Sequence, residues 1–228
     1  MQRFFLVFFF VATVVRPSSS HAEGKLEGAE QRAQAVIRRA IEAHGHDALI
    51  RASVRFSFRG TPYSMRRDNG QFVYERWTTR GTSKSHETLT NQGYTATING
   101  QRISLPPRVQ DSRRKSLNSV VYFASLPLVL RDPAVRATAL SPTRIKGERY
   151  DTIQVQFSEN GGGDDHDDVF LYWFEQKTGR LAYLAYRFHT GQGGVRFRVA
   201  TGFTKSGQVT FVQWDNYGLE DKTVSLAS

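Results

Sequence analysis

The chain has 228 residues, no cysteine, an aromatic share of 12% and a formal net charge of +10. The lack of cysteine excludes disulfides, zinc–thiolate sites, iron–sulfur clusters and cysteine nucleophiles, and the aromatic share argues against global disorder. The positive charge indicates anionic partners.

The first residues have the pattern of a secretory signal peptide. Arg3 precedes an uncharged apolar run from Phe4 to Val15, and small residues lead to a cleavage position after Ala22. This run is shorter than the roughly 20 apolar residues that cross a bilayer as a helix. We predict a signal peptide over residues 1–22 and a single domain over 23–228. The mature protein is expected to be periplasmic or secreted and not membrane-spanning; an uncleaved anchor is the alternative.

Apolar residues at three- and four-residue spacing predict a helix over residues 27–43, and a short helical turn is expected over 48–52. From Val54 the apolar period changes to two, which is typical of half-buried strands. Asn99-Gly100 is a strong signal for a hairpin turn. The strands expected in this part cover residues 54–58, 62–66, 71–78, 83–91, 94–98 and 101–105.

Residues 111–132 interrupt the alternation. Helical spacing returns there, and Pro127 is expected to end or kink the helix. Asp132-Pro133 predicts the start of a second short helix that runs to Ala139. Strands are then expected over residues 143–146, 150–158, 169–176, 180–189, 194–202 and 208–217.

Several of these strands are apolar on both faces, as between Val169 and Phe174. Both sides of such strands must be covered, and the short turns between them favour antiparallel neighbours. We therefore predict an α+β fold. In it, a curved antiparallel sheet, or open barrel, wraps the N-terminal helix and the central helical insert.

The loop from Asn160 to Asp168 concentrates groups that can bind a metal. Asp164, Asp165, His166 and Asp168 offer the oxygen and nitrogen ligands that a divalent cation prefers, and three glycines before them let the backbone curl. The loop lacks the ligand spacing of an EF-hand. Two interpretations follow: a solvated hairpin loop without a cofactor, or a divalent-cation site. No catalytic residue is assigned, because the common hydrolase, metalloprotease and nucleotide-binding motifs are absent.

His44 and His46 flank Gly45 at the end of the predicted first helix. Two imidazoles can contribute to a metal site, but the sequence offers no obvious third ligand. A helix terminus with favourable dipole contacts is the alternative interpretation.

Basic residues are concentrated in the middle of the chain, where residues 51–150 hold 18 Lys and Arg residues against 6 Asp and Glu residues. An exported protein seldom meets nucleic acid, so the expected anionic partners are lipid head groups, lipopolysaccharide or acidic polymers of the envelope. A solvated basic face that aids solubility is the alternative.

Large aromatic residues give the main candidate ligand site. We predict that Trp77, Tyr122, Phe123 and Trp173 line an apolar cavity between sheet and helices, with Arg76 at its rim. The same residues would also suit a filled core, because the two arrangements share one sequence pattern.

The order of the predicted elements resembles the LolA/LolB lipoprotein-carrier superfamily. This resemblance implies an unclosed barrel with helices as a lid over an apolar cavity that holds acyl chains. The chain also resembles an uncharacterised exported bacterial family of unknown function. The segments that carry this second likeness are residues 116–123, 126–127, 150–173, 181–186 and 194–198.

These observations favour a periplasmic binding or carrier protein for a lipid-like or other amphiphilic ligand over an enzyme. Two alternatives remain open. One is a metal-assisted enzyme that uses the Asp-rich loop 164–168, and the other is an envelope protein-interaction module that binds through exposed sheet edges.

Overall fold

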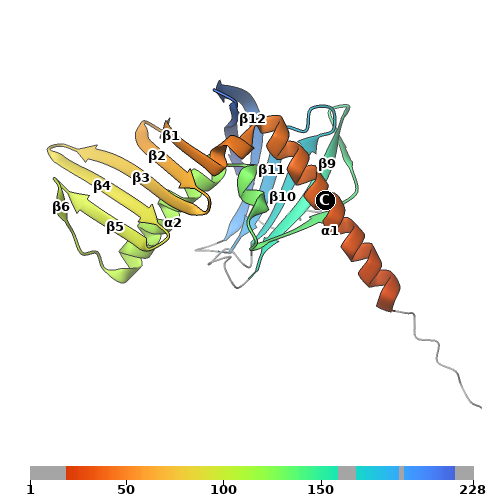
Figure 1. The fold of residues 1–228 in the computed structure, drawn as a ribbon, viewed down its shortest axis with the longest axis horizontal. Helices are drawn as coiled ribbons and strands as arrows, with labels where there is room; N and C mark the ends of the chain where they lie inside the picture. Colours follow the sequence, from red (N-terminus) through yellow and green to blue (C-terminus); the bar gives the residue numbers. More distant parts are fainter. Residues whose placement is uncertain (1–18, 159–167, 190–192, 219–228) are drawn as a thin grey trace, which may run out of the picture.

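The computed structural model describes residues 19–158, 168–189 and 193–218, which contain two antiparallel sheets and two α-helices (Figure 1). The N-terminal half consists of α1 (Ser19–His44), η1 (His46–Ile50), β1 (Arg51–Phe58), β2 (Thr61–Asp68), β3 (Gln71–Arg80), β4 (Ser83–Thr90), β5 (Gly93–Ile98), β6 (Gln101–Arg102) and α2 (Pro107–Ala124). The C-terminal half consists of η2 (Leu128–Arg131), β7 (Val135–Ala139), β8 (Thr143–Ile145), β9 (Glu148–Phe157), β10 (Val169–Glu175), β11 (Leu181–Phe188), β12 (Gly194–Ser206) and β13 (Val209–Gly218).

The first sheet is a meander of six strands in the order β1 to β6. Its hairpins form because short turns join alternating strands, as at Asn99 and Gly100, where both residues adopt a positive φ. One face, with Tyr63, Met65 and Tyr74, is buried under α2, which packs on β3 and β4. The opposite face carries mainly polar side chains. We call these the inner and the outer face of the first sheet.

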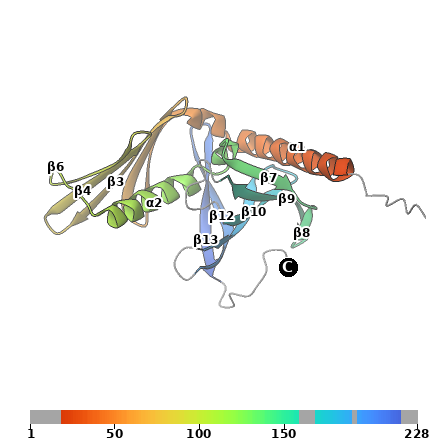
Figure 2. The ribbon, with the colours of Figure 1, turned by 90° about the horizontal axis from the view of Figure 1, so that it is seen from below.

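The second sheet has seven strands, in the order β13-β12-β11-β10-β9-β7, with β8 also paired to β9. Helix α1 packs along β7 through Ala33, Ile37 and Ile41, whose helical spacing places them on one buried side. Figure 2 shows α1 lying along the second sheet and α2 along the first. The main core therefore forms where each helix covers one sheet.

The α+β class and the unclosed antiparallel sheets are confirmed, with one difference in detail. The strands form two sheets rather than one continuous sheet, because α2 follows the two-residue strand β6 and carries the chain from the first sheet to the second. Neither α1 nor α2 has the length and apolar character of a membrane-crossing helix in its described part. The predicted signal peptide covers residues 1–22, of which residues 1–18 lie outside the described residues, and its cleavage stays a prediction.

The prediction of a second short helix from Asp132-Pro133 to Ala139 is wrong. Residues Val135–Ala139 form strand β7, which pairs with β9 and buries Val135 and Ala137. Asp132 does make the kind of contact that caps a helix, since its carboxylate accepts a hydrogen bond from the Ala134 N–H. The alternation that follows it fits a strand, and pairing with β9 decides the conformation.

The two histidines at the end of α1 are fully buried where α1, the first sheet and strand β13 meet. The Nδ1–H of His44 and the Nε2–H of His46 both donate to the carbonyl oxygen of Thr210, at 3.0 Å each. The Nε2 of His44 accepts the Leu181 N–H at 3.1 Å, which requires a neutral ring. These contacts fix the helix end to the second sheet, and neither ring belongs to a metal-binding group among the described residues.

Acid is expected to weaken this junction. Burial lowers the pKa of His44, and it lowers the pKa of His46 to about 4; each ring also lies near a cation, Arg180 or Arg67. The unfolded chain then binds more protons than the folded chain between about pH 6.5 and 4, so stability falls as pH falls through that window. For His46 alone the expected loss between pH 7 and 5 is about 2 kcal/mol. Urea unfolding at several pH values measures it.

The variant His46→Gln provides the check on this pH dependence. Its amide can donate to the same carbonyl but does not titrate, so the slope of stability against pH should become shallower than in the wild type. An unchanged slope would show that His46 is not the responsible group.

Candidate ligand-binding site

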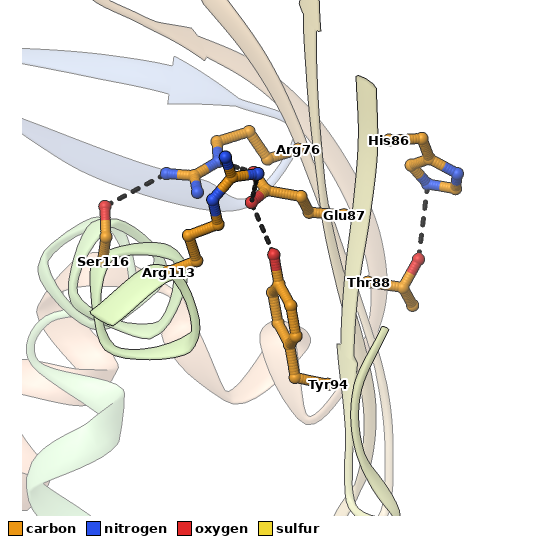
Figure 3. A network of polar contacts seen from close by, with 7 residues as sticks. All are labelled: Arg76, His86, Glu87, Thr88, Tyr94, Arg113 and Ser116. Atoms are coloured by element: carbon orange, nitrogen blue, oxygen red, sulfur yellow. Dashed lines mark hydrogen bonds and ion pairs between the residues drawn. The ribbon is translucent and has the colours of Figure 1, made fainter. Parts of the chain in front are cut away.

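The underside of α2 holds a buried charged network on the inner face of the first sheet (Figure 3). Glu87 on β4 has a side chain that is only 3% exposed. Its carboxylate accepts hydrogen bonds from Arg76 Nε and from the Tyr94 hydroxyl, both at 2.5 Å, and a longer one of 3.4 Å from Arg113 Nη1. Arg76 also donates to the Ser116 Oγ at 3.0 Å. The network therefore connects β3, β4 and β5 to α2.

Arg76 therefore neutralises the charge of Glu87 and connects α2 to the first sheet. Burial on its own would raise the pKa of Glu87, but Arg76, Tyr94 and Arg113 outweigh burial and hold that pKa below its usual range. The side chain of Arg76 is 13% exposed, so it does not stand free at a rim. Its predicted role in ligand binding stays untested, and its position indicates a structural one.

The C-terminal end of α2 leaves the first sheet and packs on the second. The Tyr122 hydroxyl lies 2.8 Å from the hydroxyl of the fully buried Tyr172 on β10. The ring of the next residue, Phe123, lies 5.9 Å from that of Tyr186. Tyr122 and Phe123, predicted together as ligand-binding residues, thus lie together in an aromatic cluster. The further rings in this cluster belong to Phe157 and Phe170.

The side chain of Arg198 on β12 lies in this cluster. No acidic side chain among the described residues neutralises its charge. Its guanidinium carbon lies 3.6 Å from the centroid of the Phe123 ring, and its Nη2 donates a long hydrogen bond of 3.4 Å to the Tyr186 hydroxyl. The buried Nε has no hydrogen-bond partner, and no carboxylate of the described chain pairs with this arginine. Burial lowers the pKa of Arg198, and the positive charge of Arg59 acts in the same direction.

A partly buried cation that lacks a counter-ion is costly, and the contact with an aromatic face offsets only part of that cost. The arrangement is therefore electrostatically suited to an anion. Phenol hydroxyls and aromatic rings surround the guanidinium, so an anion bound there would have apolar groups next to it.

The two tryptophans predicted for the same cavity lie elsewhere. Successive strand residues point to opposite faces, so Trp77 faces away from Arg76 and from α2, on the outer face of the first sheet. There its ring stacks on His86. Trp173 likewise points away from Tyr172, to the other side of the second sheet, where it contacts Phe197. The four predicted aromatic residues therefore do not surround one common space.

Only part of the predicted metal loop can be placed. Asp164, Asp165 and His166 lie outside the described residues. Asp168 is buried, and its Oδ1 accepts hydrogen bonds from the backbone N–H of His189 and from that residue's Nδ1, each at 3.1 Å. Within the described ranges no group of three or more His, Cys, Asp or Glu side chains is placed to hold a metal ion. The divalent-cation site stays a prediction.

The family model that matches residues 7–228 describes a family of unknown function, DUF6503. The chain belongs to this family. This confirms the resemblance to a family of unknown function that the sequence segments indicated. No curated protein sequence matches the chain.

Several solved structures are similar to this DUF6503 chain. A LolA superfamily protein from Nitrosomonas europaea is 13% identical, with coverage of 83% of this chain and 94% of its own and a TM-score of 0.44. A DUF1329 family protein from Desulfovibrio piger is 8% identical, with coverage of 82% and 86% and a TM-score of 0.40. A putative outer membrane lipoprotein-sorting protein domain from Vibrio parahaemolyticus is 11% identical, with coverage of 86% and 96% and a TM-score of 0.33.

Two candidate site residues of this DUF6503 chain were not predicted from the sequence. Arg198 stands in an alternating strand of basic and apolar residues, where it resembles an ordinary solvent-facing arginine. Glu87 is a lone acid in a strand rich in Ser and Thr. The signal that could have found Glu87 is its position two residues before Leu89, on the face that the core buries.

Proposed function

We propose that the chain is a periplasmic binding or carrier protein for an amphiphile with an anionic head group. The head group pairs with Arg198, and the apolar part lies along the aromatic cluster at the C-terminal end of α2. The observation that carries this proposal is the charge of Arg198 directly beside Phe123, for which the described residues supply no carboxylate partner. An anion would offset the desolvation of the guanidinium, and apolar burial at roughly 25 cal/mol per Å² would supply further affinity.

The surroundings of Arg198 support an amphiphile rather than a small inorganic anion. Phe123, Tyr186 and Phe157 are only partly buried, so apolar surface remains accessible next to the cation. The signal-peptide pattern supports the periplasmic location.

Titration of the purified protein with a dansyl-labelled fatty acid tests this function. We expect saturable binding by the wild type, and binding about 10-fold weaker or more in Arg198→Gln, because the cation beside the aromatic cluster is lost. Arg196→Gln is the matched control: this exposed arginine lies two residues earlier on the same strand, and its loss should change the affinity less than about 2-fold.

Thermal unfolding of both variants establishes that they are folded. If the wild type binds no probe and carries no lipid by native mass spectrometry when purified from its own envelope, the proposal fails. It also fails if the two arginine variants weaken binding equally, because a general charge effect would then explain the affinity.

A further inference from the structure

The first sheet carries a depression of about 540 Å³ at strands β1, β2 and β3. It is lined by Arg55, Phe56, Pro62, Tyr63 and Trp77. Strand alternation places Arg55, Pro62 and Trp77 on the outer face, while Phe56 and Tyr63 belong to the opposite side. Figure 3 shows this separation on β4: His86 and Thr88 lie on one side of the strands, and Glu87 with α2 lies on the other.

The indole of Trp77 is held in a fixed orientation. Its ring and the His86 imidazole are almost parallel, at 5° and with 5.0 Å between centroids. The Nε2 of His86 lies 2.9 Å from Glu75 Oε1, and the other oxygen of that carboxylate accepts the Ser64 hydroxyl at 2.7 Å. His86 lies on the β4 side of the indole, and the depression that Trp77 lines together with Arg55 and Pro62 lies on the side of β1 and β2.

The charge of this face is positive and largely unpaired. Arg55 and Arg66 form no ion pair with any acidic side chain of the described chain, whereas Arg51 pairs with Asp68 at 3.4 Å. The second acid of the face, Glu75, is occupied by His86 and Ser64. Arg55 therefore offers its guanidinium at the edge of the depression that Trp77 borders.

We propose that this depression binds an acidic oligosaccharide that carries carboxylates. The apolar side of one sugar ring packs on the free face of the Trp77 indole above Pro62, and a carboxylate of the sugar pairs with Arg55 in bidentate geometry. The exposed hydroxyls of Ser53 and Ser57 on β1 suit further sugar hydroxyls. The shallow, open form of the site suits a polymer that crosses the sheet, and its charge excludes a cationic partner.

Isothermal titration calorimetry with tetragalacturonate tests the site, with maltotetraose as the neutral probe of the same length. We expect the wild type to bind tetragalacturonate, and to bind maltotetraose at least about 10-fold more weakly. Trp77→Ala and Arg55→Gln should each weaken tetragalacturonate binding by about 10-fold or more. Both side chains are on a solvated face, so thermal midpoints should remain near that of the wild type.

Arg102→Gln is the matched control, because Arg102 is exposed on the same face at the far strand β6. It should leave the affinity within about 2-fold of the wild type. Equal weakening by Arg55→Gln and Arg102→Gln would overturn the proposal in favour of general attraction to a basic surface. Absence of tetragalacturonate binding, equal binding of maltotetraose, or unchanged binding by Trp77→Ala would each overturn it as well.

Discussion

Gly45→Ala is expected to lower the free energy of unfolding by at least about 4 kcal/mol. Gly45 ends α1 with a φ of 64°, a conformation that costs an alanine about 1 kcal/mol. The larger cost is steric, since a Cβ at this position would lie 2.0 Å from the backbone oxygen of Gln208. The turn between β12 and β13 would have to move, and the hydrogen bonds of His44 and His46 to Thr210 would move with it.

Chemical unfolding followed by circular dichroism measures this loss, and Gly207→Ala separates its two causes. Gly207 has nearly the same φ, 58°, and a Cβ added there would meet no atom of the described chain within 4 Å beyond its immediate neighbours. That variant should therefore lose only about 1 kcal/mol, the cost of the backbone conformation alone. Similar losses in the two variants would show that contact with Gln208 does not restrict position 45.

Glu87→Gln is expected to cost about 3 kcal/mol of stability. The amide keeps an acceptor for the Tyr94 hydroxyl but removes the charge that compensates Arg76, which is mostly buried between the sheet and α2. A buried ion pair that loses one partner leaves a desolvated charge, and this penalty exceeds the loss of a surface pair. Urea unfolding of wild type and variant provides the measurement.

Asp111→Asn is the matched control for this loss of a carboxylate. Asp111 lies on the same helix as Arg113 and pairs with Arg114 and Lys115, but its carboxylate is exposed, so its replacement should leave the unfolding midpoint near the wild-type value. The double variant Arg76→Gln/Glu87→Gln should be less destabilised than the sum of the two single variants. Additive losses would contradict a direct coupling between the two charges.

Much of the fold could be predicted from the sequence because its signals are local. The alternation around Val54 and Phe56 predicted β1, and Asn99-Gly100 predicted a hairpin whose turn needs two positive φ values. Strand β7 could not be predicted in the same way. The residues just before it carry a helix-capping signal, and only pairing with β9 determines that Val135 enters a sheet.

The candidate site was predicted less well, and strand geometry explains why. Arg76 and Trp77 are adjacent on one strand, so they cannot both face the same side of the sheet. The composition shows that both aromatic and basic side chains are abundant. It does not show which face of a sheet each helix covers. Tyr122 and Phe123 lie side by side because they share the end of one helix, whereas the position of Arg198 depends on contacts between β12 and α2.

The hydrogen bonds at the end of α1 also bear on the order in which the molecule assembles. The six strands of the first sheet are all joined to their neighbours by short hairpins, so their pairing does not depend on later parts of the chain. Helix α1 is made earlier, yet its partner Thr210 lies 166 residues beyond His44, and Leu181 lies 137 residues beyond it. Helix α1 therefore reaches its final position only after strand β13 has taken its place in the second sheet.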